Sequence, residues 1–165
     1  VTLQFPFFMA KQAPKSGHIS TLDYEVKWQA QIKSKQFKLI TSVLVPATSL
    51  CPASKSMSDY GAHNQRSHLE IAVDANPTVY IEDIIAVAER NASAPVYACL
   101  KRNDEKHMTE AAYDNRKFVE DIVRDIACEL NCNKAIQRYR IRCENFESIH
   151  NHSAYAVIEK DWGQS

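Results

Sequence analysis

The sequence feature that most limits the possible folds is a strict alternation of apolar and polar residues over residues 24–32. Its apolar members are Tyr24, Val26, Trp28, Ala30 and Ile32. A period of two places these side chains on one face of an extended segment, which predicts a strand buried on one side. A polar break at residues 33–35 and an apolar run over residues 37–45 follow. Together the two segments predict a long antiparallel hairpin, which Pro46 is expected to end.

Two later segments have the periodicity of amphipathic helices. Over residues 81–88 the apolar positions follow i, i+3, i+4 and i+7. Over residues 116–130 an apolar residue recurs every four positions, and Asn115 or Asp114 is expected to cap the start of this helix. Residues 109–113 are interpreted as a single helical turn.

Three further segments are interpreted as strands, over residues 67–73, 136–143 and 154–158. The last of them is apolar on both faces, so we expect it in the middle of a sheet. The order of elements is therefore strands, two helices, and strands again.

Composition excludes several classes of protein. The 165 residues suffice for one domain with a core, and 20 basic residues balance 20 acidic ones. A neutral chain gives no electrostatic reason to expect nucleic acid or an anionic membrane as a partner, and no apolar run approaches the roughly 20 residues of a membrane span. Three glycines leave no room for a phosphate-binding glycine loop, and five cysteines without compact pairing predict free thiols and a cytoplasmic location.

The stretch "CPASKSMSDYGAHNQRSH" contains the first set of reactive side chains, Cys51, His63 and His68. Thiolate and imidazole are good ligands for zinc and related metals. A spacing of twelve residues between Cys51 and His63 is nevertheless a weak signal. A buried cysteine and a histidine bonded to backbone would explain the same residues.

Two other stretches carry groups with possible chemistry. The first, residues 101–121, is rich in carboxylates, although such charge runs are usually solvated helix faces. The second, "ENFESIHNHSAY", places His150 and His152 just before an apolar strand. Two histidines entering a buried strand are unusual because burial disfavours their charged form, and a tail with locally bonded imidazoles is the alternative. Together the three stretches offer what a mononuclear hydrolytic metal site needs.

The run "TSLCPASKSMSDYGAHNQRSH" closely resembles the signature of the prokaryotic type IB GTP cyclohydrolase I family. The resemblance continues through "FPFFMAKQAPKSG", "LKRNDEKHMTEAAYDNRKFVEDIVRDIA" and "FESIHNHSAYA", and it covers nearly all of the chain in the same order. It implies an α+β tunnelling fold, in which an antiparallel four-stranded sheet has two helices packed on one face and modules form a barrel on oligomerisation. It also implies hydrolysis of GTP to dihydroneopterin triphosphate and formate, with sites where modules of a homo-oligomer, expected to be a tetramer, meet.

The resemblance also assigns roles to residues. Cys51, His63 and Glu105 match the family's metal ligands, with zinc as the common occupant and manganese or iron as alternatives. Glu120 matches the carboxylate that anchors the purine, and His150 matches a late histidine that we assign to proton transfer. The residues expected to bind the triphosphate are Lys55, Arg66, Lys101 and Arg102.

Two departures from the family pattern keep other functions open. Ala53 stands where the family usually has a second cysteine. Family chains also carry a further module ahead of "FPFFMAK", so we expect residues 1–165 to form a single tunnelling-fold module. A non-catalytic module that binds a purine or pterin, or that serves in assembly, is the main alternative. The "GAHNQRSH" stretch argues against a third, a nitrile reductase of the same superfamily.

Overall fold

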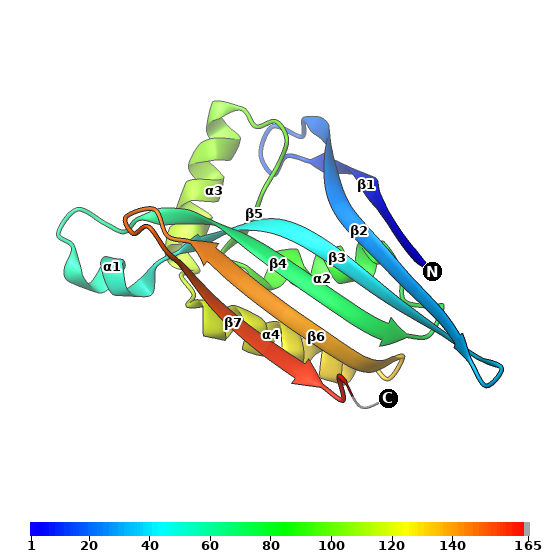
Figure 1. The fold of residues 1–165 in the computed structure, drawn as a ribbon. Coiled ribbons are helices and arrows are strands. Elements are labelled where there is room, and N and C mark those ends of the chain that lie inside the picture. Colours follow the sequence, from blue (N-terminus) through cyan, green and yellow to red (C-terminus); the bar gives the residue numbers. More distant parts are fainter. Residues whose placement is uncertain (164–165) are drawn as a thin grey trace.

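The computed structural model describes residues 1–163, and they form one antiparallel sheet with helices against it (Figure 1). The sheet order is β1-β2-β3-β4-β6-β7, and the short β5 pairs with β3. The strands are β1 (Thr2–Gln12), β2 (Ile19–Lys33), β3 (Gln36–Leu50), β4 (Asn64–Ala75), β5 (Ala94–Pro95), β6 (Ile136–Phe146) and β7 (Ser153–Lys160). The α+β class and the antiparallel pairing are confirmed. The prediction of four strands is wrong, because the described residues form seven.

Two of the four helices within the described residues cover one face of the sheet. The helices are α1 (Pro52–Met57), α2 (Ile81–Asn91), α3 (Arg102–Asp114) and α4 (Val119–Cys132). In Figure 1, α2 and α4 lie behind the sheet, and the core forms between them and the strands. Fully buried Ile84, Ile122 and Ile126 pack there against strand residues such as Leu69 and Ile141. None of the helices within residues 1–163 has the length and apolar character that crossing a bilayer requires.

The predicted hairpin is present, but it continues beyond its expected end. Ser34 and Lys35 both have positive φ in the two-residue turn between β2 and β3, as the tight turns that suit a twisted hairpin require. Strand β3 runs through Pro46 to Leu50, so the prediction that proline ends it is wrong. The β2–β3 pairing stops at Leu44. Pro46 therefore lies past the last β2 partner, where a missing N–H is tolerated.

The two outer strands were not anticipated in these positions. Strand β1 was not predicted at all, and β7 is an edge strand rather than a central one. Tyr155 and Val157 on β7 remain 66% and 38% exposed, so the apolar residues on its second face are not covered within this chain.

Helix α3 and the start of α4 also differ from the prediction. Residues 109–113 belong to a thirteen-residue helix rather than to a single turn. Helix α4 begins at Val119, where the Asp121 carboxylate accepts a hydrogen bond from the backbone N–H of Phe118 at 3.2 Å. Asn115 therefore does not cap α4. It ends α3 instead, and its side-chain amide donates to the carbonyl of Ala92 at 2.9 Å.

Candidate metal and nucleotide site

Cys51 and His63 lie at the two ends of a loop that closes on itself. Cys51 caps α1, and its Sγ accepts a hydrogen bond from the Ser54 N–H at 3.4 Å. The Cys51 N–H donates to the His63 carbonyl at 3.3 Å, and the His63 N–H donates to Ser54 Oγ at 3.2 Å. Cys51 and His63, twelve residues apart in sequence, are thus held together by one backbone hydrogen bond and by the Ser54 side chain. In Figure 1 this loop and α1 project from one end of the sheet.

The β6–β7 connection supplies the side chains nearest to His63. Glu147 Oε2 lies 3.9 Å from His63 Nε2 and 3.8 Å from His150 Nδ1, and Ser148 Oγ lies 3.0 Å from His63 Nδ1. The Glu147 side chain is only 14% exposed. The structure therefore brings His63 and His150 together around Glu147, which the sequence reasoning did not identify. Its position three residues before His150 was the available signal.

Glu147 is held by a buried polar group beneath it. Gln65, 7% exposed, donates from Nε2 to Glu147 Oε1 at 3.0 Å. Because Nε2 makes this bond, the other amide atom, Gln65 Oε1, is an acceptor that is not bonded to Glu147. Within residues 1–163, Gln65 Oε1 and the neighbouring Ser49 Oγ are buried without a hydrogen-bond partner. Buried polar atoms are normally paired, so these two could serve a bound ligand or water.

The remaining predicted metal ligand, Glu105, lies away from Cys51 in the same chain. It is exposed in the first turn of α3. The part of α3 beside α1 is Tyr113, whose hydroxyl and ring both contact the Lys55 ammonium, 4.0 Å from the ring centre. Glu105 and Tyr113 are eight positions apart in the helix, a rise of roughly 12 Å. Within residues 1–163 of this single chain, no three His, Cys, Asp or Glu side chains lie close enough to hold a metal ion.

Glu120 occupies the first turn of α4 and is exposed. Its carboxylate is near enough to act on Cys143, a buried residue of β6. Burial raises the pKa of the Cys143 thiol to about 12; the Arg142 guanidinium opposes this, and the carboxylates of Glu120 and Glu144 add to it. Cys143 is therefore a neutral thiol, neither a nucleophile nor a ready metal ligand. All five cysteines within the described residues are free.

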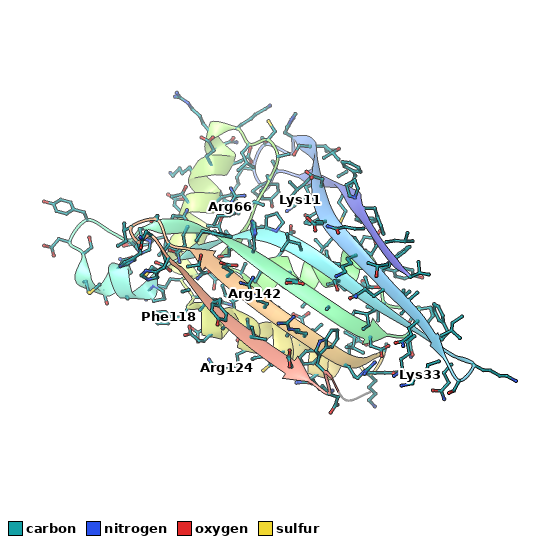
Figure 2. The ribbon with its side chains drawn as sticks, viewed as in Figure 1. Lys11, Lys33, Arg66, Phe118, Arg124 and Arg142 are labelled. Atoms are coloured by element: carbon teal, nitrogen blue, oxygen red, sulfur yellow. The ribbon has the colours of Figure 1, made fainter. Side chains whose placement is uncertain are left out.

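The basic residues expected to bind a triphosphate come from three elements. Lys55 lies on α1, Arg66 on β4, and Lys101 and Arg102 at the start of α3. Arg66 (Figure 2) is exposed, whereas its neighbours Gln65 and Ser67 are buried on the helix side of the sheet.

The other two histidines of these stretches, His68 and His152, contact rings rather than Glu147. His68 packs edge-on against the Phe146 ring, with centroids 4.7 Å apart. The His152 ring lies 5.0 Å from that of His150 and is exposed. His68 thus packs against an aromatic ring, whereas the alternative stated above was a histidine bonded to backbone.

The fold and the site together define a class: an antiparallel α+β module with a thiol, two imidazoles and a carboxylate at one end of its sheet. The chain belongs to the family described as type I GTP cyclohydrolase folE2, whose sequence model matches residues 1–156. It is 55% identical over 161 residues to a protein of Methylobacillus flagellatus named GTP cyclohydrolase FolE2, covering 98% of this chain and 60% of the relative. A protein of the same name from Nitrosomonas eutropha is 56% identical over 162 residues, which cover 98% of this chain and 61% of that protein. The chain thus spans about three fifths of the length of these curated relatives.

Proposed function

We propose that this chain is the catalytic part of a metal-dependent, cytoplasmic GTP cyclohydrolase of type IB, which converts GTP to 7,8-dihydroneopterin triphosphate and formate. Family membership and more than 50% identity over nearly the whole chain support this activity. The structural observation that carries the proposal is the approach of Glu147 to both His63 and His150, with Cys51 joined to His63 by a backbone hydrogen bond. These groups combine potential metal ligands with a potential proton donor, as hydrolysis at a ring carbon requires.

The metal site is proposed to use Cys51, His63 and Glu105, with zinc as the first candidate and manganese or iron as alternatives. The donor set suits zinc, since thiolate and imidazole are its usual ligands. Because Glu105 lies at the far end of α3 from α1, we infer that it reaches the site of a neighbouring copy in a homo-oligomer such as a tetramer. The open sheet edges, β1 and β7, are consistent with closure into a barrel between copies. A bound divalent ion would lower the pKa of a water molecule that attacks the purine.

The remaining roles follow from the chemistry of each side chain. His150 protonates the ring nitrogen of GTP as water adds at C8, because an imidazole exchanges protons near neutral pH. Glu147, held by Gln65, orients both imidazoles. Glu120 can accept two hydrogen bonds from the guanine N1–H and exocyclic amine. Lys55, Arg66, Lys101 and Arg102 are the candidates for the triphosphate.

A non-catalytic purine- or pterin-binding module is the second candidate. It is favoured by Ala53, which stands in place of the thiol that the family pattern usually has. Such a module would bind GTP without releasing formate. Binding and turnover measured on the same sample therefore separate the two functions.

The test is turnover of GTP by the metal-loaded chain, followed by formate release and by the fluorescence of the oxidised pterin. We expect product from the wild-type chain and from His18→Asn, a control at an exposed histidine in the β1–β2 turn. We expect at least a hundredfold loss in His150→Asn, since a positioned acid or base contributes about 10²–10⁴-fold. GTP binding without formate, in protein with a full metal complement, would support the non-catalytic candidate instead.

A further inference from the structure

Helix α3 is attached to the rest of the molecule largely by polar contacts, because few of its apolar residues are buried. Of its thirteen residues only Asp104 and Ala112 are buried. Most helices are stabilised by packing of an apolar stripe, and in α3 this stripe is short: Ala112 is buried, whereas Met108 and Ala111 are only half-buried. At its C-terminal end the attachments are Tyr113, which contacts Lys55, and Asn115, which donates to the Ala92 carbonyl.

At the N-terminal end a single carboxylate makes the attachment. Asp104 is fully buried. Its Oδ1 accepts hydrogen bonds from the backbone N–H groups of Lys15 and Ser16, both at 2.8 Å, and its Oδ2 accepts from the N–H of Lys101 at 3.0 Å. One oxygen thus binds the β1–β2 turn, and the other caps the helix. A carboxylate at this position also complements the positive end of the helix dipole.

A second tether holds the segment that leads into α3. Lys11 (Figure 2) on β1 donates from Nζ to the Val96 carbonyl at 2.7 Å and to Glu89 at 2.6 Å, and it lies 4.4 Å from the centre of the Tyr97 ring. Tyr24, only 1% exposed, donates its hydroxyl to the same Glu89 oxygen at 2.7 Å. The residues before α3 and the residues at its start are therefore both fastened to the β1–β2 hairpin.

We propose that Asp104 is a positioning residue, which fixes the start of α3 to the β1–β2 turn and thereby sets the placement of Lys101, Arg102 and Glu105. These three residues flank Asp104 and are exposed, so no packing of their own holds them. The functional half of this inference rests on the site proposed above, in which Glu105 binds metal and the two cations bind phosphate. The structural half, that one carboxylate holds the turn and the helix start together, rests on the hydrogen bonds alone.

The test uses Asp104→Asn, with Asp114→Asn at the exposed end of the same helix as the matched control. The asparagine amide has an NH₂ group in place of one carboxylate oxygen. This donor would face either the N–H groups of Lys15 and Ser16 or the N–H of Lys101, which are donors themselves. Hydrogen exchange measured by mass spectrometry should show at least tenfold faster exchange of residues 13–18 and 100–106 in Asp104→Asn, and no change in the control. Cobalt titration, followed by absorbance, should show metal affinity about tenfold weaker in Asp104→Asn, as for other residues that orient a ligand.

The outcomes separate the two halves of the inference. Faster exchange with unchanged cobalt affinity would overturn the positioning role and leave only a structural one. Unchanged exchange in both segments would overturn the attachment itself. If Asp104→Asn does not fold, exchange in the wild-type chain decides: the Lys15 and Ser16 amides should be protected, and exchange at the rate of an unstructured peptide would refute the inference. Absence of GTP turnover in the wild type would count against the proposed function alone, because exchange and cobalt binding do not depend on it.

Discussion

The buried thiol of Cys143 makes a quantitative prediction about stability at alkaline pH. Its pKa is raised to about 12 in the folded chain, chiefly by burial, from an ordinary value of 9.0. Between these values the unfolded chain loses the thiol proton and the folded chain keeps it. A group with a raised folded-state pKa contributes its full stability below the unfolded pKa, and that contribution falls as pH rises toward the folded pKa.

The size of the effect follows from the shift. Each pH unit across the window is worth about 1.4 kcal/mol, so the contribution of Cys143 to the free energy of unfolding should fall by roughly 2 to 3 kcal/mol between pH 8 and pH 11. Other groups also titrate in this range. The prediction therefore concerns the difference between the wild-type chain and Cys143→Ala, which lacks the thiol.

The assay is urea unfolding of both proteins at several pH values from 8 to 11, under reducing conditions. We expect Cys143→Ala to be less stable at pH 8, because it leaves a small cavity, and to lose less stability than wild type as pH rises. Cys128→Ala, at an exposed cysteine of α4, should follow the wild-type curve. Parallel curves for wild type and Cys143→Ala would refute the reasoning and would mean that this thiol is reached by solvent in the folded chain.

Three further substitutions test the site and the core. Glu147→Gln should weaken metal binding about tenfold to a hundredfold in a cobalt titration, since it loosens His63, whereas the exposed Glu110→Gln should leave it unchanged; equal affinities in the two variants would remove Glu147 from the site. Ile126→Ala, at a fully buried position of α4, should lower the free energy of unfolding in urea by about 2–5 kcal/mol, and a loss below 1 kcal/mol would contradict the core described above. Val157→Ala on the edge strand should cost less than half as much by the same measurement, because that side chain is already 38% exposed.

The strands and amphipathic helices were predictable because a single face of each is buried. The alternation from Tyr24 to Trp28 and the spacing of Ile81, Ile84 and Ile85 both report directly which side of an element meets the core. Helix α3 gave only a weak signal, because few of its apolar residues are buried and much of its attachment consists of hydrogen bonds that Asp104 accepts and Asn115 donates.

The edge position of β7 could not be read from its composition. A strand that is apolar on both faces predicts a central place, but Tyr155 and Val157 face outward without cover within this chain. Apolar residues on an edge strand are typical of a surface that meets another molecule. Burial that arises between copies gives the same sequence pattern as burial within one chain, so the sequence alone does not distinguish them.

Some residues of the candidate site were identified from the sequence, and others were not. His63 and His150 were both identified, and the structure brings them together. Glu147, which joins them, lies three residues before His150, but it is one of many carboxylates in the sequence and nothing else distinguished it. The distance between Glu105 and Cys51 along the fold depends on how α3 is oriented, which no local pattern determines.

The central claim is that the metal site combines Cys51 and His63 of one copy with Glu105 of another. It is tested most directly by co-refolding Cys51→Ala with Glu105→Gln in equal amounts and measuring formate release from GTP. Each variant alone should be inactive, and the mixture should recover about one quarter of the wild-type activity, since that fraction of sites at interfaces between copies receives all three intact ligands. A mixture as inactive as its components, beside an active wild-type chain, would contradict the claim.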